Sequence, residues 1–251
     1  MGVRVTMAAS LWATAILSSA DAFADAPAAP ASTNAAPEPS FGLNATAALL
    51  SDYRYDGVSE SNRRPTWQAG LTYVGRSGLY VGTQLTGVDV QDKPRTRLEA
   101  DVFAGALIPV AGSDLGLQVS YMSYPDQRAP GPRYAFVEPQ VSLTHRFERL
   151  TLSGEADWSP AYFGGLGQAW DLRAGGALAV RHWLTLSGHI GRLWLSRGPS
   201  LIDWDLGGTA SWRRLYVDVR YGGTDLGDAQ CGFTSWCAPG VSATVGVRIW
   251  P

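Results

Sequence analysis

The chain has 251 residues, enough for one large all-β domain or two small ones. Its net charge of −2 provides no basic field for nucleic acid, so we expect no nucleic-acid partner. Hydrophobic residues make up 45% of the chain and charged residues only 17%, and the 10 Trp, 10 Tyr and 29 Gly suit strands and aromatic belts better than a cytosolic enzyme.

The N-terminal segment has the three parts of a secretory signal peptide. Arg4 provides a positive charge, residues 8–20 form an apolar run, and residues 22–24 read Ala-Phe-Ala, an A-x-A cleavage site before Asp25. A membrane anchor is the alternative interpretation, but the apolar run is shorter than the roughly 20 residues of a spanning helix. We therefore predict a signal peptide over residues 1–24, and export.

The next segment, residues 25–40, is composed mainly of Ala, Pro, Ser, Thr and Asn. Such a segment cannot bury enough apolar surface to offset its ordering entropy, so we expect a flexible periplasmic leader. We expect the folded domain to span residues 41–251. No later apolar run reaches about 18 residues without interruption, so we predict no second membrane helix.

From Phe41 onward, apolar and polar residues alternate in segments of about ten residues. Along residues 215–222, for example, Leu, Val, Val and Tyr alternate with Tyr, Asp, Arg and Gly. An extended strand places two such sets on opposite faces, whereas a helix would scatter them around its axis. The pattern predicts twelve strands, which begin near residues 41, 66, 79, 97, 115, 134, 150, 169, 184, 202, 215 and 240.

Short and long connections alternate between the predicted strands. An up-and-down outer-membrane barrel has this property, because its periplasmic turns are short and its external loops are long. An even number of strands then leaves both chain ends on the periplasmic side. The short connections are residues 76–78, 148–149, 182–183 and 213–214, and the long ones include residues 53–65, 125–133 and 225–239.

A soluble β-sandwich is the competing architecture, because it has the same strand spacing. Its polar faces would contact water and carry Lys, which this chain hardly contains. The polar faces here carry many small residues instead, such as Gly70, Gly82, Gly105, Gly175 and Ala177, which suit a crowded lumen. In lipid, every backbone N–H and C=O group must be hydrogen-bonded, so a membrane-spanning sheet must close into a barrel. We predict an all-β, transmembrane, antiparallel up-and-down β-barrel of about 12 strands in the bacterial outer membrane.

The only two cysteines, Cys231 and Cys237, lie close together in one segment. Because an exported domain folds in an oxidising compartment, we predict a disulfide between them. Two cysteines alone do not form a zinc site, and the residues between them include no His or carboxylate. We expect no metal and no cofactor.

Seven short motifs occur along the first two thirds of the chain: ALLSDYRYDGVSES (48–61), WQAG (67–70), SGLYVG (77–82), LEAD (98–101), YMSYP (121–125), VEP (137–139) and SPAYFG (159–164). In this order they resemble the TorF-type porin family of proteobacterial outer membranes, over about Leu49 to Gly164. Asp56 stands where that family usually has a basic residue, and Arg63 and Arg64 replace an acidic stretch. The resemblance implies a porin-like barrel without a defined solute.

The polar parity of each strand predicts which charged side chains face the lumen. The predicted pore-lining residues are the acids Glu99, Asp101, Glu138, Glu155, Asp157, Asp171, Asp203, Asp205 and Asp218, the bases Arg146, Arg173, Arg181, Arg220 and Arg248, and the titratable His189. Buried charges must be hydrated or paired. A water-filled channel with this excess of acids would be mildly cation-selective, whereas arginine–carboxylate pairing would plug the lumen. A barrel of twelve strands permits both.

Three functions remain open at this stage. Passive diffusion of small polar solutes through a narrow pore is the first, and a structural or adhesive barrel acting through external loops, including Phe233 and Trp236, is the second. An outer-membrane lipid hydrolase is the third, and it would need a Ser near a His, as at Ser187 and His189. We expect no enzyme. The expected partners are outer-membrane lipid, small polar solutes and the barrel-assembly machinery during insertion, and the oligomeric state stays open.

Most tryptophans lie near predicted strand ends, where outer-membrane barrels carry aromatic girdles. A carbohydrate-stacking track is the alternative, for which only Tyr80, Phe103 and Tyr216 have the inward parity. Trp250 is out of phase with the apolar face of residues 241–249, which departs from the usual insertion signal. The girdle candidates are Trp67, Trp158, Trp170, Trp183, Trp194, Trp204, Trp212 and Trp250.

Overall fold

The computed structural model describes residues 42–232 and 234–249, so the predicted signal peptide, the leader and Trp250 lie outside it. Apart from one turn of 3-10 helix, η1 (Phe163–Gly165), the regular elements of these residues are strands. They are β1 (Gly42–Leu50), β2 (Arg54–Tyr55), β3 (Val58–Ser59), β4 (Thr66–Val74), β5 (Leu79–Gly87), β6 (Leu98–Val110), β7 (Ser113–Ser123), β8 (Phe136–Phe147), β9 (Leu150–Tyr162), β10 (Gly167–Arg181), β11 (Leu184–Leu195), β12 (Leu201–Trp212), β13 (Leu215–Thr224) and β14 (Gly240–Ile249).

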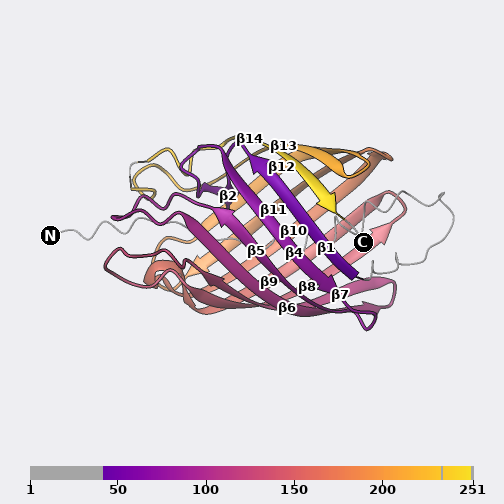
Figure 1. The fold of residues 1–251 in the computed structure, drawn as a ribbon, viewed down its shortest axis with the longest axis horizontal. Helices are drawn as coiled ribbons and strands as arrows, with labels where there is room; N and C mark the ends of the chain where they lie inside the picture. The colour runs from indigo at the N-terminus through magenta and orange to yellow at the C-terminus, as the bar shows by residue number, and fades with distance from the viewer. Residues whose placement is uncertain (1–41, 233, 250–251) are drawn as a thin grey trace.

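Twelve of these strands form one closed antiparallel barrel, in the order β1-β14-β13-β12-β11-β10-β9-β8-β7-β6-β5-β4 (Figure 1). The barrel closes at β1, where Leu49 pairs with Trp67 of β4 on one side and with Val245 of β14 on the other. Every barrel strand is therefore hydrogen-bonded to a neighbour along both edges, so no unpaired strand edge faces lipid. The predicted up-and-down barrel and its count of twelve strands are confirmed. None of the described residues forms a helix long and apolar enough to cross a membrane.

The two ends of the barrel differ in their connections, as the sequence predicts. Tight turns join β4–β5, β6–β7, β8–β9, β10–β11 and β12–β13 at one end, called here the turn end. At the β6–β7 turn, Ala111 and Gly112 both have a positive φ, 48° and 80°, which is the conformation of a type I′ hairpin. The longer connections lie at the opposite end, called here the loop end, which is on the left in Figure 1.

The outer face of the barrel is apolar. Large hydrophobic side chains are exposed on all twelve barrel strands, and on β13, Leu215, Val217, Val219 and Tyr221 are each about half exposed (45–50%). A soluble sandwich would bury these apolar side chains between its two sheets, whereas a membrane barrel turns them towards lipid. Exposed aromatic residues lie near both ends, such as Trp183 and Trp212 at the turn end and Trp67 and Trp170 at the loop end. This pattern excludes the sandwich.

One connection folds into the barrel instead of extending outward. Residues 51–65, called here the inserted loop, contain the two-stranded hairpin β2–β3. Tyr53, Tyr55 and Val58 of this loop are buried with apolar residues of the barrel wall. Gly57, at the tip of the hairpin, has φ +72° and lies so close to the backbone of Gly223 that a side chain would not fit. The loop therefore depends on glycine at this close approach.

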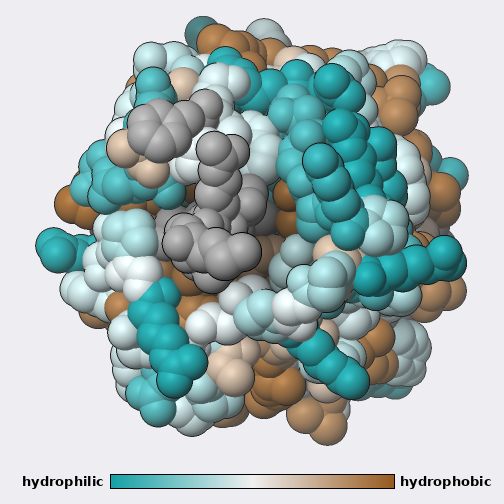
Figure 2. All heavy atoms as spheres, turned by 90° about the vertical axis from the view of Figure 1, so that its left-hand side faces the viewer, coloured by the Kyte–Doolittle hydropathy of each residue, from teal (hydrophilic) through white to brown (hydrophobic). Residues whose placement is uncertain are grey.

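The loop end has a second layer around the inserted loop. The predicted disulfide Cys231–Cys237 is present in the β13–β14 connection and confirms that prediction. Trp236 of this connection accepts a backbone hydrogen bond from Ser59 (2.9 Å), and its indole donates to Asn62 (2.8 Å). Hydrophilic side chains cover much of this end, with apolar ones at its periphery (Figure 2). The disulfide-linked connection thus holds the inserted loop from outside.

Candidate functional site: a charged network across the lumen

The polar residues at alternate positions of each strand face the interior of the barrel. The buried members of the predicted lining set lie in the half of the barrel nearer the loop end: Glu99, Asp101, Glu138, Asp157, Asp171, Arg173 and Asp203. Half-buried members are Arg146, Glu155, His189, Asp205, Asp218, Arg220 and Arg248. Arg181 is different, because it follows a register shift at the end of β10 and is exposed at the turn end. The structure thus brings together most of the charges of β6 to β13, whereas Arg146 and Arg248 lie nearer the turn end and Arg181 is exposed there.

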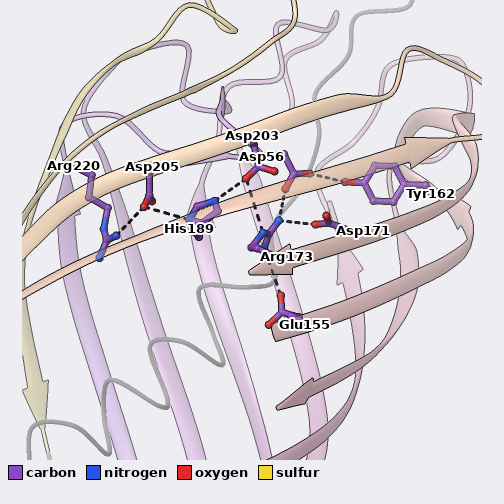
Figure 3. Close-up of polar contacts among 9 residues, drawn as sticks. All are labelled: Asp56, Glu155, Tyr162, Asp171, Arg173, His189, Asp203, Asp205 and Arg220. Carbon is purple, nitrogen blue, oxygen red and sulfur yellow. Dashed lines mark hydrogen bonds and ion pairs between the residues drawn. The ribbon is translucent and has the colours of Figure 1, made fainter. Parts of the chain in front are cut away.

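Arg173 on β10 is the centre of a network of ion pairs. Its Nη2 lies 2.7 Å from Oδ1 of Asp56 and 2.6 Å from Oδ2 of Asp171 (Figure 3). Its Nη1 lies 3.5 Å from Glu155, and its Nε lies 3.9 Å from Asp203. Arg173 is only 7% exposed, so its charge requires these partners. One guanidinium therefore faces four carboxylates.

The contact between Asp56 and Arg173 shows how far the inserted loop reaches. The loop leaves the wall at β1, and β10 lies five strands away by the shorter path through β14, β13, β12 and β11. In a barrel of twelve strands, five steps lead to nearly the opposite wall. Asp56 also accepts a hydrogen bond from the hydroxyl of Tyr162 on β9 (3.4 Å). The loop thus crosses the lumen and narrows it.

The network continues along β11 to β13 through His189. Its Nε2 lies 2.7 Å from Asp203 and its Nδ1 lies 3.3 Å from Asp205, so both ring nitrogens face carboxylates (Figure 3). Arg220 follows, with Nη1 3.2 Å from Asp205 and Nε 2.9 Å from Asp218. Basic and acidic side chains therefore alternate on this side of the lumen.

A second group of acids lies on β6, beside Tyr53 of the inserted loop. Glu99 accepts hydrogen bonds from the hydroxyls of Tyr53 (3.1 Å) and Tyr124 (2.6 Å). Asp101, on the same face of β6, is fully buried, and neither of its carboxylate oxygens has a hydrogen-bond partner among the described residues. These two acids of β6 are in none of the described ion pairs.

Two carboxyl groups of the inserted loop have shifted pKa values. Burial raises the pKa of Glu60 well above its usual range, and the charges of Glu99 and Asp56 raise it further. Burial also raises the pKa of Asp56, assisted by Asp171, although Arg173 opposes this shift. Glu60 is in none of the described ion pairs, so its protonation favours the inserted position of the loop.

Towards the turn end the interior has fewer acids. Tyr80 and Phe103 are buried there with their rings 6.3 Å apart, and the hydroxyl of Tyr80 donates to Gln118 (3.0 Å). Arg248 lies over the ring of Tyr216, 4.4 Å from its centroid. The three predicted inward aromatics thus lie on two separate groups of strands and do not form a continuous stacking track.

The arrangement around Ser187 does not resemble that of a hydrolase. Its Oγ accepts a hydrogen bond from Nη2 of Arg220 (2.9 Å). Both nitrogens of His189 face carboxylates, so neither is positioned to take a proton from Ser187. Among the described residues, no group of three or more His, Cys, Asp or Glu could hold a metal ion.

Sequence reasoning missed two parts of this interior. It placed residues 53–65 in an external connection, so Asp56 and Glu60 were not among its lining residues. The apolar Tyr53, Tyr55 and Val58, which a solvated loop would not need, were a signal that this segment is buried. It also selected only charged residues, and so omitted the uncharged polar side chains of the wall.

Comparisons with known proteins place the chain in a family and support its fold. The model of the family described as "Bacterial protein of unknown function (Gcw_chp)" matches residues 34–248, so the chain belongs to this family. The comparison with curated proteins found no match. Among solved structures, the chain is similar to a KdgM porin, with 9% identity and a TM-score of 0.56 over 83% of this chain and 98% of the porin.

Two further structures are similar over the same share of this chain. The COG4313 outer membrane channel from Pseudomonas putida F1 has 10% identity and a TM-score of 0.54 over 83% of this chain and 95% of that chain. A KdgM porin in complex with disordered oligogalacturonate has 9% identity and a TM-score of 0.55 over 83% of this chain and 98% of that chain. At such low identities these similarities concern the fold, which is that of outer-membrane β-barrels.

Proposed function

We propose that this member of the Gcw_chp family is an outer-membrane channel for the passive diffusion of small polar solutes, with a mild preference for cations. The observation that carries the proposal is a closed barrel with an apolar outer face and a polar, acid-rich inner face. The similarity to outer-membrane channels and the resemblance to TorF-type porins support it. The chain would be exported by its signal peptide and inserted into lipid by the barrel-assembly machinery.

The cation preference follows from the balance of charge along the lumen. Arg173 faces four carboxylates, and Glu99 and Asp101 have no base in contact. A lumen with this excess of negative charge concentrates cations and repels anions. The proposed solutes therefore differ from the oligogalacturonate in the KdgM complex, whose carboxylates would be repelled here.

The inserted loop makes the proposed passage narrow. It crosses from β1 to Arg173 on the far wall, and the disulfide-linked connection holds it from outside. Solutes must pass beside this loop or displace it. We assign to it the role of a gate whose closed position depends on the Asp56–Arg173 pair.

Planar-bilayer recordings test this function. Purified, folded protein is expected to produce discrete conductance steps. In a KCl gradient, the sign of the reversal potential is expected to show that K⁺ is more permeant than Cl⁻. A second protein, in which Asp56 is replaced by Asn, is expected to conduct more because its loop is less firmly held. Silence of both folded proteins would exclude the channel.

The second candidate function is a structural or adhesive barrel that acts through its external loops. The observation that favours it is the exposed arginines around Asp89, since the side chains of Arg64, Arg95 and Arg97 are 63%, 42% and 55% exposed. A basic rim suits contact with acidic groups on a partner. Deletion of residues 91–95 that abolished binding of such a partner while conductance remained would favour it. A lipid hydrolase has no comparable support from the geometry of Ser187 and His189.

A further inference from the structure

We propose that four neighbouring side chains on β8 and β9 form a binding site for a primary ammonium group of a cationic solute. These residues, Glu138 and Gln140 on β8 and Asp157 and Ser159 on β9, are called here the β8–β9 site. The inference deepens the proposed function, on which it rests for the route by which the cation arrives. The site borders the Arg173 network, because Asp157 pairs across the β9–β10 ladder with Asp171, but none of the described ion pairs includes Glu138 or Asp157.

Strand register brings the four side chains together. Gln140 pairs directly with Asp157 across the β8–β9 ladder. Glu138 and Ser159 each lie two residues further towards the loop end, on the same face of their strands. Directly opposed residues in an antiparallel pair lie about 4.5–5.5 Å apart, so the four side chains are neighbours on the inner face of the wall.

All four side chains are buried and incompletely hydrogen-bonded. Their exposed fractions are 3% for Glu138 and Gln140, 2% for Asp157 and 0% for Ser159. Within the described part of the chain, five of their atoms have no hydrogen-bond partner: Oε1 of Glu138, Oε1 and Nε2 of Gln140, Oδ1 of Asp157 and Oγ of Ser159. A buried polar group without a partner costs about 1–3 kcal/mol, so five in one place indicate that a ligand completes them.

The adjacent strand shows what a satisfied arrangement looks like. Gln118 on β7 pairs directly with Gln140 and has the same 3% exposure. Its amide nitrogen donates to Ser120 (2.8 Å), and its amide oxygen accepts from Tyr80 (3.0 Å). Two glutamines at the same depth thus differ, because the amide of Gln118 has two hydrogen-bond partners, whereas that of Gln140 lies beside Asp157 without a hydrogen bond of good geometry among the described residues.

The chemistry of the site selects the ligand. It presents four oxygen acceptors, two of them from carboxylates, and none of the described ion pairs includes Glu138 or Asp157. A primary ammonium has one positive charge and three N–H donors, which match such a set. The rings of Phe136 and Tyr162 pack 4.7 Å apart on the same two strands, towards the loop end from the site.

A binding experiment with two matched probes tests the inference. Methylammonium chloride and tetramethylammonium chloride, which has the same charge but no N–H donor, are titrated calorimetrically into the folded full-length protein in detergent at constant ionic strength. We expect methylammonium to bind at least about tenfold more tightly, because only it forms charge-assisted hydrogen bonds. Equal binding of the two probes, or tighter binding of Na⁺ or Mg²⁺ in the same titration, would overturn the ligand class.

Substitutions locate the binding. Glu138→Gln and Asp157→Asn are each expected to weaken methylammonium binding about tenfold or more, and Gln140→Leu about two- to tenfold. Gln118→Leu is the matched control and is expected to leave the affinity unchanged. Affinity that is insensitive to the three site variants, or equally sensitive to Gln118→Leu, would place the ligand elsewhere.

Conductance of the same preparations separates this inference from the proposed function. Channels that conduct in KCl but bind no methylammonium in calorimetry would contradict the β8–β9 site and leave the channel intact. Folded protein that binds methylammonium through Gln140 but never conducts would support the site and contradict the channel.

Discussion

The interior of the barrel has two unlike walls. The inward side chains of β14, β1, β4 and β5, apart from Arg248, are uncharged and are mostly Thr, Ser, Gln, Asn and Gly. We refer to these strands as the neutral wall. The strands β6 to β13 form the acidic wall, which carries the network of Arg173 and the β8–β9 site. The strands of the neutral wall have 9 or 10 residues, whereas β10 on the acidic wall has 15.

The inserted loop connects these two walls. It leaves the neutral wall at β1 and attaches to the acidic wall through Asp56 and Arg173. A wall of small hydroxyl and amide side chains offers the loop no charged partner, whereas the acidic wall offers Arg173. Arg173 therefore has two roles. It compensates the charge of the buried carboxylates of the acidic wall, and it holds the inserted loop across the lumen.

The largest effect is expected from Arg173→Met, which removes the base that faces four carboxylates. Breaking a buried network from one side leaves uncompensated charge, so we expect the free energy of unfolding in detergent to fall by about 3–5 kcal/mol. Urea titration of the folded barrel measures this. Arg181→Met is the matched control on the same strand, because Arg181 is exposed and has no described ion pair. Equal loss in both variants would show that Arg173 is not the attachment point.

Asp56→Asn breaks the contact between the walls and leaves the acidic wall itself unchanged. Losing one charge-assisted hydrogen bond costs about 1.5–3 kcal/mol, so the ratio of open to closed channels should rise about tenfold or more in bilayer recordings. If the loop acts through this pair, adding Asp56→Asn to Arg173→Met should have little further effect. Additive changes would mean that the loop is held by other contacts.

The pH dependence of gating should follow Glu60, which lies in the inserted loop. Because its pKa is raised in the inserted position, that position binds the proton more tightly and is favoured at low pH. As the pH rises above the usual value of about 4.3, ionisation favours release of the loop by up to about tenfold per pH unit. Bilayer recordings between pH 4 and 8 should therefore show an open probability that increases with pH.

Glu60→Gln should flatten that profile. Glu148→Gln at the exposed β8–β9 turn serves as the control and should leave it unchanged. A wild-type profile that falls with rising pH would contradict the assigned sign.

The smallest effect comes from placing single charges on the neutral wall. Thr72 on β4 is half-buried on the inward face, so Thr72→Glu and Thr72→Lys should shift the permeability ratio of K⁺ to Cl⁻ in opposite directions. At about 8 Å in water, one charge is worth about half a kcal/mol, or roughly twofold in that ratio. Reversal potentials in a KCl gradient measure it, with Thr72→Gln as the uncharged reference. No shift in either variant would mean that ions pass only along the acidic wall.

The strands and their order were accessible to sequence reasoning, because each barrel strand is a local pattern. Alternation along residues 215–222 indicates a strand without knowledge of its neighbours, and the short turn at residues 213–214 determines which strand precedes it. The disulfide was predictable for a similar reason, since only six positions separate Cys231 from Cys237. The inward parity of Arg173 and Asp203 followed from the same rule.

The candidate site was only partly accessible. The contact between Asp56 and Arg173 joins residues 117 positions apart, and no local pattern specifies it. Parity could assign Arg173 to the interior but could not choose among its four carboxylates. The difference between Gln118 and Gln140 was also invisible, because both are inward glutamines and only their neighbours distinguish them.

The sequence by itself determined the closed barrel, its two unlike ends and, apart from Arg181, which charged strand residues face inward, because a period of two and the length of each connection are local properties of the chain. Only the tertiary structure decided the path of the inserted loop, the partners of Arg173 and the unsatisfied group on β8 and β9. Those depend on the register at which β1 meets β4 and β14, and on closure, which brings distant strands to opposite sides of one lumen.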